Sequence, residues 1–505
     1  MTQGTASALW RNFLGQSPSW YKWSLLIALC VNYLAVRVAG NEVAGWLVLA
    51  EFIGTLAMAL KCYPLQPGGL IAIQAVLLNL TDAKSVYNET LAGMPVILLM
   101  IFMVTAIYFL RDLLQVIFTG LLLKVRSHLA LSLLFCLSSA VLSAFLDALT
   151  VIAVMITAIT GFYVVYHQVA SGKSHQEIHA GGGHDHTADD HVHALHREDL
   201  ETFRGFLRGL MMHAAIGSAL GGAMTLVGEP QNLLIAKQAG WTFTQFFVAM
   251  APISIPVLLA GALTCVLIER LRWFGYGIEL PPRVYQVLSE HAAVVVAQRT
   301  VRDRAQLAVQ MMVAVIMVLA LVMHWAEVGL VGLLMIILAT AFTGINDEHR
   351  IGKAFEASLP FTALLVVFFA IVAVIHEQHL FEPFTSWVLS MTGKKQLAMM
   401  FAATGALSAV SDNVFVATIY ISGIKASLLE SMIDQRNFEQ LAVAINAGTN
   451  IVSVATPNGQ AAFLFLLTSS LAPLIRLSYG RMLWMALPYT IVLTVAAFIA
   501  MVYLL

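Results

Sequence analysis

Two acidic residues lie inside apolar stretches that resemble each other. Asp147 lies five residues after Leu142 and Asp412 five residues after Leu407, and in both stretches the leucine begins the same Leu-Ser-Ala sequence. A charged group in hydrocarbon is costly, so an acid within a membrane segment is a candidate functional residue. Two such acids in matching contexts predict a duplicated device for handling cations.

The composition supports the membrane setting that this interpretation needs. Hydrophobic residues make up 59% of the 505 residues and charged residues 11%, whereas soluble domains carry about 25% charged residues. One crossing takes about 20 apolar residues, so the apolar runs allow on the order of a dozen crossings. The sequence predicts an all-α polytopic membrane protein. A net charge of -1 gives no sign of a nucleic-acid partner.

Helix-breaking residues follow each acid at a distance. Gly228, Pro230 and the amides Gln231 and Asn232 interrupt one apolar segment, with Glu229 between them. Backbone that is not helical is tolerated at membrane depth only where protein or a water-filled cavity surrounds it. The segment is therefore interpreted as a re-entrant turn that lines a site.

The second half contains a similar interruption, made by Pro457, Asn458 and Gly459. Superposing Pro457 on Pro230 places Thr456 on Glu229 and Gly448 on Gly221. Paired interruptions in corresponding halves point to a transporter's binding site. The alternative is that these residues only kink two helices.

The spacing between acid and proline differs between the halves. It is 83 residues from Asp147 to Pro230 and 45 from Asp412 to Pro457, a difference of 38. Residues 167–204 number 38 and include a histidine-rich loop, so an insertion there accounts for the difference.

The histidine-rich loop holds eight of the fifteen histidines between His167 and His196. Such tracts can bind metal ions, or they can be solvated loops or respond to pH. The weak candidates for a metal site are His184, His186, His191 and His193. No firm metal site is predicted.

The division of the chain follows from these features. Residues 1–268 are interpreted as a first membrane repeat, 269–304 as a basic connection and 305–505 as a second membrane repeat. The connection is cytoplasmic by the positive-inside rule, because it is rich in arginine. Glu51 also falls inside an apolar run, and a buried acid needs a partner.

Several motifs together resemble those of the NhaB family of bacterial sodium/proton antiporters. They lie at residues 14–18, 58–64, 145–150, 228–232, 411–415 and 455–460, and the similarity covers essentially the whole chain. The resemblance implies the fold of the wider ion transporter superfamily, with two inverted repeats, re-entrant hairpins and broken helices, often in a homodimer.

The resemblance also implies a function. The protein would be a secondary transporter, not an enzyme, in the multi-pass setting of the bacterial inner membrane. It would export Na+, and by extension Li+, in exchange for H+ by alternating access, and so support sodium and pH homeostasis. Its partners would be these two cations and membrane lipid, and it would need no cofactor.

The residue roles follow from the chemistry of the two cations. Protons and sodium ions can exclude one another at shared carboxylates, for which Asp147 and Asp412 are the first candidates and Glu229 the third. Candidate neutral ligands or hairpin-tip residues carry amide or hydroxyl oxygens: Asn232, Asn413, Asn450, Thr456, Asn458 and Ser411. The candidate helix breakers are Gly228, Pro230, Pro457 and Gly459.

Three other functions fit parts of the sequence. A sodium-coupled organic-anion symporter would share the superfamily fold, but the acid at Glu229 would repel its substrate. An intramembrane aspartyl protease also needs two aspartates, but the chain contains no Tyr-Asp or Gly-Asp pair. A metal transporter is indicated only by the histidine-rich loop.

Overall fold

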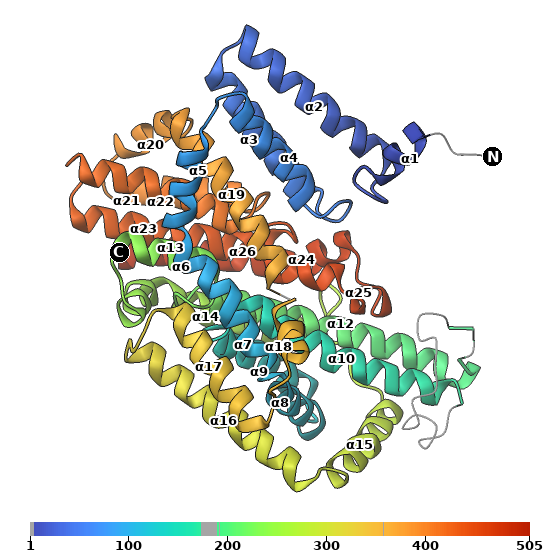
Figure 1. Ribbon diagram of the computed structural model, residues 1–505. Coiled ribbons are helices and arrows are strands. Elements are labelled where there is room, and N and C mark those ends of the chain that lie inside the picture. Colours follow the sequence, from blue (N-terminus) through green and yellow to red (C-terminus); the bar gives the residue numbers. More distant parts are fainter. Residues whose placement is uncertain (1–4, 173–188, 191, 357) are drawn as a thin grey trace.

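The computed structural model describes residues 5–172, 189–190, 192–356 and 358–505, which form helices joined by turns and loops (Figure 1). Within these ranges six helices are long and apolar enough to cross a bilayer: α2 (Ser19–Val38), α10 (Ala148–Ala170), α14 (Phe243–Leu271), α16 (Val301–Val322), α19 (Leu359–Glu377) and α26 (Tyr479–Leu504). The chain is thus an all-α polytopic membrane protein, as predicted. Several of the predicted crossings are shorter helices of 10–17 residues.

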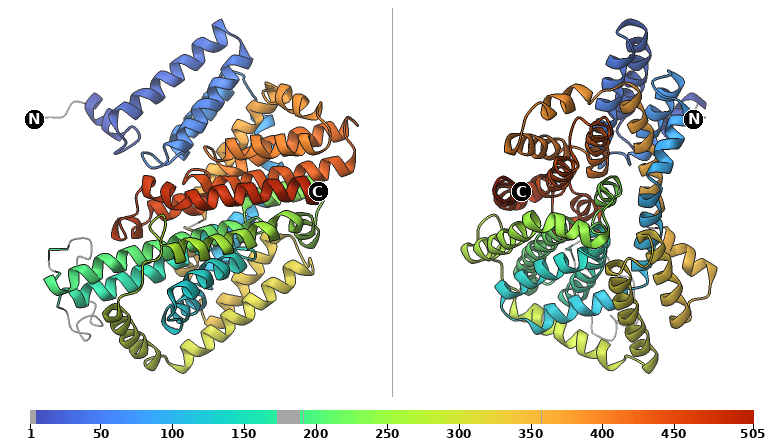
Figure 2. Two further views of the ribbon diagram at one scale, coloured as in Figure 1. Left: turned by 180° about the vertical axis from the view of Figure 1, so that it is seen from behind. Right: turned by 90° about the vertical axis from the view of Figure 1, so that its left-hand side faces the viewer.

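An N-terminal arm extends to one side of the molecule in Figures 1 and 2, and it packs on α19, where the ring centroid of Phe52 lies 5.5 Å from that of Phe368. It consists of α1 (Thr5–Asn12), α2, α3 (Asn41–Ala57) and α4 (Leu65–Leu77). Inside the arm, Asn32 Nδ2 donates hydrogen bonds to Glu51 Oε2 at 2.6 Å and to Gln74 Oε1 at 3.1 Å. Glu51 therefore has a partner on a neighbouring helix, the Asn32 amide of α2, which is itself held by Gln74 of α4.

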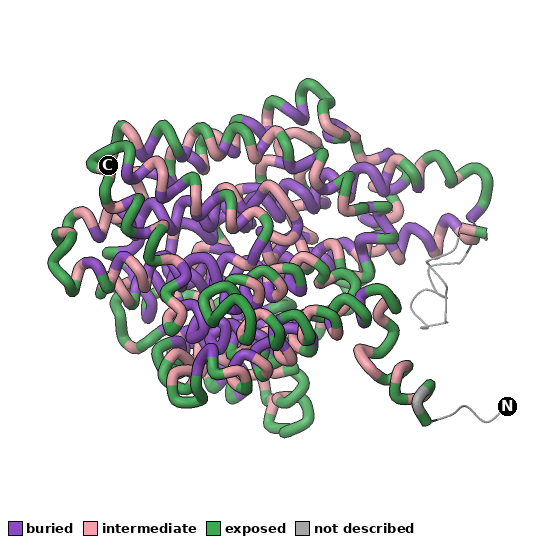
Figure 3. Tube along the Cα trace, turned by 90° about the horizontal axis from the view of Figure 1, so that it is seen from above, coloured by how far each residue is buried: buried purple, intermediate pink, exposed green. Residues whose placement is uncertain are grey.

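A set of surrounding helices lies beside the centre of the molecule. Its members are α5 (Ala83–Ala92), α6 (Met94–Leu98), the π-helical η1 (Leu99–Met103), α7 (Val104–Tyr108), α8 (Arg111–Lys124), α15 (Pro282–Ala297), α16, α17 (Val328–Thr343), α18 (Glu348–Phe355), α19 and α20 (Glu382–Leu389). Figure 3 shows buried residues gathered toward the centre and exposed ones along the outer helices. The exposed residues include large apolar side chains, which suits a surface that faces lipid.

The first central unit contains α9 (His128–Ser143), α10, α12 (Ala194–Gly222), α13 (Pro230–Ala239) and α14. A Cβ added at Gly217 would lie 2.1 Å from Cys136 O, and one at Gly221 would lie 1.8 Å from Ala140 O. These contacts advance together along both helices, so α9 and α12 run parallel.

Helix α10 runs the other way. Arg204 Nη2 donates to Tyr163 Oη at 2.6 Å, and His196 Nδ1 lies 3.3 Å from Tyr166 Oη. The later residue of α10 contacts the earlier residue of α12. Helix α10 is therefore antiparallel to α12, and so also to α9. Helices α9 and α10 form a helical hairpin with Asp147 at its tip.

The second central unit contains α21 (Lys394–Ser408), α22 (Asn413–Leu429), α23 (Gln435–Ile451), the 3-10 turn η2 (Val452–Ala455), α24 (Ala461–Thr468), α25 (Leu471–Leu474) and α26. Contacts of Gly448 with Phe401 and of Gly405 with Val452 make α21 parallel to α23. Lys425 near the end of α22 lies over the Phe438 ring near the start of α23. Ser408 Oγ contacts both Asn413 at the start of α22 and Thr449 O near the end of α23, so α22 runs against α23. Helices α21 and α22 are thus a second hairpin, with Asp412 at its tip.

The two hairpins extend from the centre toward opposite sides, α10 and α12 toward the right of the view and α21 to α23 toward the left (Figure 1). This arrangement corrects one prediction. The interruptions at Gly228–Asn232 and at Pro457–Gly459 are not hairpin tips. The first lies where the chain enters α13, which begins at Pro230, and the second lies between η2 and α24, so both are breaks within broken helices. The tips are the two Asp-bearing turns.

The connection that follows the first hairpin is shorter than predicted. Residues 167–170 belong to α10 and residues 194–204 to α12, and His167 and Arg204 are buried. Of the weak metal candidates, His184, His186 and His191 lie outside the described residues.

Candidate functional site

Each Asp occupies the same position at the start of a helix. Asp147 is the N-cap of α10 and accepts hydrogen bonds from Thr150 N at 3.3 Å and Thr150 Oγ1 at 3.4 Å. Asp412 is the N-cap of α22 and accepts from Val414 N at 2.8 Å and Phe415 N at 3.3 Å. Aspartate satisfies free backbone N–H groups at a helix start and is favoured there by the helix dipole. This explains why an acid is tolerated at the tip of an apolar hairpin.

A threonine from each broken helix is bonded to the backbone of the matching hairpin. Thr225 Oγ1 donates to Ala144 O, and Thr456 Oγ1 donates to Ala409 O. Ala144 and Ala409 each precede their Asp by three residues. Thr225 and Thr456 are therefore counterparts.

The close glycine contacts give the same correspondence. Gly217 meets Cys136 and Gly448 meets Phe401, while Gly221 meets Ala140 and Val452 meets Gly405. Corresponding hairpin residues are 265 positions apart, from 136 to 401 and from 140 to 405. Corresponding residues of the broken helices are 231 positions apart, from 217 to 448 and from 221 to 452. The superposition of Pro457 on Pro230 is thus wrong by four residues, about one helical turn, and the insertion is 265 less 231, or 34 residues.

With the corrected correspondence, Glu229 matches Gln460. Gly228 and Gly459 directly precede them. An added Cβ at Gly228 would lie 2.8 Å from the backbone oxygen of Ser143, and one at Gly459 would lie 2.6 Å from that of Ser408, its counterpart in the second hairpin. Glu229 is the N-cap of α13 and Gln460 is the N-cap of α24. The acidic side chain of the first half is therefore an amide in the second.

Glu229 is close enough to interact electrostatically with both aspartates, Asp147 and Asp412. Its side chain is buried, with Oε1 lacking a hydrogen-bond partner among the described residues. A small cavity of about 10 Å³ is lined by Glu229, Asp412, Asn413 and Gly459 among others. Such a volume holds roughly one water-sized group. The structure thus brings the three predicted carboxylates together.

Three of the candidate amides are already used within the protein. Asn232 Nδ2 donates to Gly222 O and Thr225 O, and its Oδ1 accepts from Asn450 Nδ2 at 2.9 Å. Asn450 Oδ1 in turn accepts from Gln231 Nε2 at 3.0 Å. Asn413 Oδ1 accepts from Ser408 Oγ. These amides hold the two broken helices and one hairpin in place.

The other neutral candidates divide into two groups. Thr456 is used, because Oγ1 donates to Ala409 O and accepts from Gly459 N at 3.0 Å. By contrast, Ser411 Oγ and Asn458 Oδ1 are buried atoms without a partner in the described ranges. Of the predicted neutral ligands, these two have oxygen atoms to offer. Pro457 and Gly459 lie in the turn between η2 and α24.

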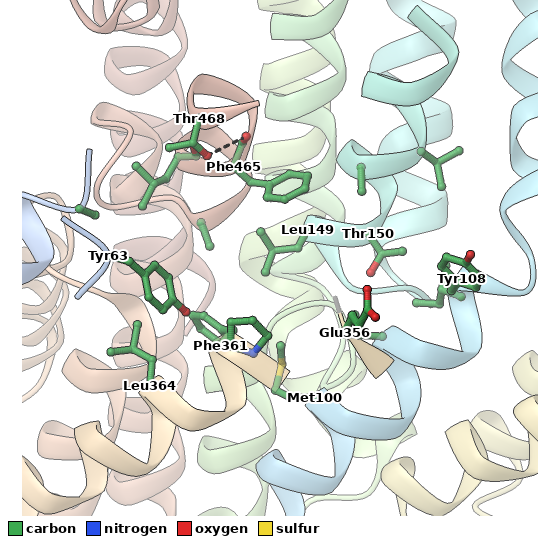
Figure 4. A pocket seen from close by; sticks show the side chains of 18 of the residues that line it. Tyr63, Met100, Tyr108, Leu149, Thr150, Glu356, Phe361, Leu364, Phe465 and Thr468 are labelled. Carbon is green, nitrogen blue, oxygen red and sulfur yellow. Dashed lines mark hydrogen bonds between the residues drawn. The ribbon is translucent and has the colours of Figure 1, made fainter. Parts of the chain in front are cut away.

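A much larger cavity, of about 760 Å³, reaches the acids from one side (Figure 4). It is lined by Asp412, Asn458 and Thr150, and Thr150 is the residue whose hydroxyl contacts Asp147. In Figure 4, Thr150 and Glu356 lie close together, with Tyr108 beside them and Tyr63 and Phe361 farther along the wall. Half-buried Asp412 meets this cavity directly, whereas Asp147 is fully buried behind Thr150.

An ion-pair cluster joins the end of the histidine-rich connection to both halves. Arg204 donates to both oxygens of Asp189, at 2.9 and 2.7 Å, and Arg476 of the second half lies 3.4 Å from Asp189 Oδ2. The hydrogen bonds from Arg204 lower the pKa of Asp189 below its usual value. The carboxylate is therefore charged at neutral pH. His193 begins α12 nearby, and in the described part of the chain no cluster of His, Cys, Asp or Glu has the makings of a metal site.

Sequence reasoning missed Thr150 and Gln460. A signal for Gln460 was present, because Thr225 is followed after two residues by Gly228-Glu229, and Thr456 after two residues by Gly459-Gln460. The prolines gave a competing alignment. Thr150 gave no separate signal, since threonine is common within buried helices.

Comparison with known proteins gives one consistent result. The sequence profile of the family described as "Bacterial Na+/H+ antiporter B (NhaB)" matches residues 1–505. Similar curated proteins named "Na(+)/H(+) antiporter NhaB" include one from Saccharophagus degradans, 61% identical over 98% of both chains, and one from Marinobacter nauticus, 61% identical over 96% of both. Another, from Aeromonas hydrophila, is 57% identical over 97% of this chain and 92% of its own.

Proposed function

The chain belongs to the NhaB family of bacterial sodium/proton antiporters, and from this membership we propose that Asp147, Asp412 and Glu229 hold the exchanged cations. The protein is a secondary transporter rather than an enzyme, its substrates are Na+ and H+, and antiport of these ions uses no cofactor. The symporter and protease alternatives do not share this family assignment.

One observation carries the site proposal. Three carboxylates from different segments meet where two hairpin tips face two broken helices, with Glu229 within electrostatic range of both aspartates. Acids that share a buried site resist being charged together. A bound Na+ or a bound proton relieves that repulsion, so each cation excludes the other.

The proposed cycle uses this exclusion. The site moves between the two membrane faces when either cation neutralises it, and an empty, charged site does not move because it would carry unpaired charge through an apolar region. Under a proton-motive force, protons enter and sodium leaves. Lithium, with the same charge and a preference for oxygen, follows the same route.

The neutral residues take different roles in this proposal. Ser411 and Asn458 are ligands or water-binding groups, because their oxygens are not used within the described protein. Asn232, Asn450, Asn413 and Thr456 are positioning residues that fix the broken helices and the second hairpin tip. Gly228, Pro230, Pro457 and Gly459 keep the backbone open beside the acids.

The cavity of about 760 Å³ serves as the approach to the acids from one face. Its lining includes Arg111 and Asp112 at the start of α8. Gln310 of α16 accepts a hydrogen bond from the backbone N of Leu113, which also belongs to α8. Helix α16 begins at Val301, at the end of the arginine-rich connection of residues 269–304, which the positive-inside rule assigns to the cytoplasm. We assign the open cavity to the cytoplasmic face.

The larger organisation remains part of the proposal. Residues 1–268 and 305–505 form two inverted repeats joined by residues 269–304, in a multi-pass protein of the bacterial inner membrane. Lipid surrounds the apolar outer helices, and two copies form a homodimer. Its role is in sodium and pH homeostasis.

Sodium-driven proton flux in proteoliposomes tests the function and the site together. Wild type releases or takes up protons when sodium is added. Asp147→Asn and Asp412→Asn are expected to lose this response, and Glu42→Gln, an exposed acid at the start of α3, is expected to keep it. Full flux in both Asn variants would show that the site assignment is wrong, and no flux in wild type would refute the transport proposal.

A further inference from the structure

Gln460 is a fully buried side chain whose polar atoms are unused. It is 0% exposed, and neither Oε1 nor Nε2 has a hydrogen-bond partner among the described residues. Burying an amide without a partner is unfavourable, and native proteins rarely leave such groups unsatisfied without a functional reason. A ligand of this amide is therefore expected.

The surroundings of Gln460 indicate what that ligand is. Its neighbours in sequence, Gly459 and Ala461, line the small cavity together with Asp412 and Glu229. Other unpartnered buried oxygens lie at the two breaks, namely Glu229 Oε1 and Asn458 Oδ1, and at the two hairpin tips, namely Asp147 Oδ1 and Ser411 Oγ. Carboxylate, amide and hydroxyl oxygens are the donors that hard cations prefer.

The comparison of the halves adds a reason for an amide at this position. Gln460 occupies in the second half the position that Glu229 occupies in the first, one residue after a glycine packed on the hairpin serine. A glutamate oxygen can take a proton in place of a metal ion. An amide oxygen offers the same reach but does not titrate, because glutamine carries no ionisable group.

We propose that Gln460 binds the transported sodium ion through Oε1 beside Asp412, and that the Glu229/Gln460 difference makes the second half the one that selects sodium over a proton. This inference rests on the proposed function, because it assumes that Asp412 holds a transported cation. It adds a specificity-determining ligand to that site.

Gln460→Met tests the proposal because it keeps the length of the side chain and removes both polar atoms. The sodium concentration for half-maximal proton flux is expected to rise on the order of tenfold, as for the loss of one good contact. The stabilisation of purified protein by sodium, measured as the shift in melting temperature, is expected to need correspondingly more salt.

Gln460→Glu provides a second variant of nearly the same shape. It gives the second half an acid like that of the first, so proton competition should strengthen, and the half-saturating sodium concentration should rise more steeply in acid than in wild type. If Gln460→Met does not fold, Gln460→Glu decides the matter. Sodium dependence within twofold of wild type at every pH, in every variant that folds, would overturn the proposal.

A matched control removes another buried glutamine. Gln396 is 2% exposed, and its Oε1 accepts a hydrogen bond from Asn437 Nδ2 at 3.0 Å. It lies at the start of α21, at the opposite end of that helix from the Asp412 tip. Gln396→Met should lower the melting temperature without changing the half-saturating sodium concentration.

Asp412→Asn, measured in the same assays, separates the two proposals. If it loses the response to sodium while the Gln460 variants match wild type, only the role of Gln460 is wrong. If Asp412→Asn responds like wild type, the cation site is wrong, and the inference falls with it.

Discussion

The two halves of the centre repeat the same contacts with different chemistry. In both, an Asp caps a helix at a hairpin tip, a threonine of the broken helix bonds to the hairpin backbone, and a glycine packs on a serine carbonyl. In the first half a glutamate and a threonine hydroxyl join the Asp, and both acids are buried. In the second half the Asp meets an open cavity, with an amide in place of the glutamate.

On the proposed site assignment, this difference lets one duplicated scaffold serve two cations. Packing contacts are common to the halves because they build the hairpin against the broken helix. On the same proposal, the ionisable groups differ because a site with two acids favours a proton more than a site with one acid and neutral oxygens.

Removing the acid that distinguishes the first half should have the largest effect. Glu229→Gln makes the two halves alike, and sodium-driven proton flux should fall on the order of 100-fold, as for the loss of roughly 3 kcal/mol of charged coordination. Flux in proteoliposomes measures it. Equal flux in Glu229→Gln and wild type would mean that the halves do not divide the work in this way.

Packing should be less tolerant in the first half than in the second. An added methyl group at Gly217 would lie 2.1 Å from the carbonyl oxygen of Cys136, whereas at its counterpart Gly448 the nearest atom is the Thr404 hydroxyl, also at 2.1 Å. A side chain can rotate away more easily than backbone can move. Gly217→Ala should cost roughly 1–3 kcal/mol or more and Gly448→Ala less, as melting temperatures in detergent will show. The reverse order would contradict the compared contacts.

The Thr150 hydroxyl, which donates to Asp147, has no counterpart at Asp412. The position that matches Thr150 in the second half is Phe415. Thr150→Val removes one hydrogen bond, worth about 1 kcal/mol or fivefold in affinity, so half-saturating sodium should rise about fivefold. Thr418→Val is the control, because Thr418 Oγ1 donates to a carbonyl within α22 instead. A similar change in both variants would show that the effect is not specific to Asp147.

The smallest effect concerns the connection that only the first half has. Asp189 faces Arg204, Arg476 and His167, and its lowered pKa means that the paired carboxylate stabilises the fold above the unfolded pKa of about 3.9. This stability is lost as the pH falls through the lower, folded pKa. Asp189→Asn should lower the melting temperature slightly and equally from about pH 5.5 to 8, because partly exposed pairs contribute roughly 0–1 kcal/mol.

A loss that grows with pH between those limits would contradict this assignment of the charge.

The fold and much of the site could be predicted from the sequence because burying an acid is costly. Asp147, Asp412 and Glu229 were conspicuous within apolar runs, and the structure brings them together. The position of the breakers could not be predicted correctly, because proline and glycine signal an interruption without indicating whether the chain reverses or continues. The continuation was decided by long-range contacts such as Gly217 with Cys136.

The pairing of the halves was misplaced for a related reason. Pro230 begins a helix, where its missing N–H costs nothing, but Pro457 lies in a turn four residues before its helix begins at Ala461. The two prolines therefore have different structural roles. Thr225 and Thr456, which make the same bond, were the residues to align.

Proton release on sodium binding tests the central claim most directly. Sodium is added to purified protein in a weakly buffered solution, and the released protons are counted for wild type and for Asp147→Asn/Asp412→Asn. The account predicts release from wild type and none from the double variant, because the two cations share these carboxylates. Undiminished release from the double variant would contradict it.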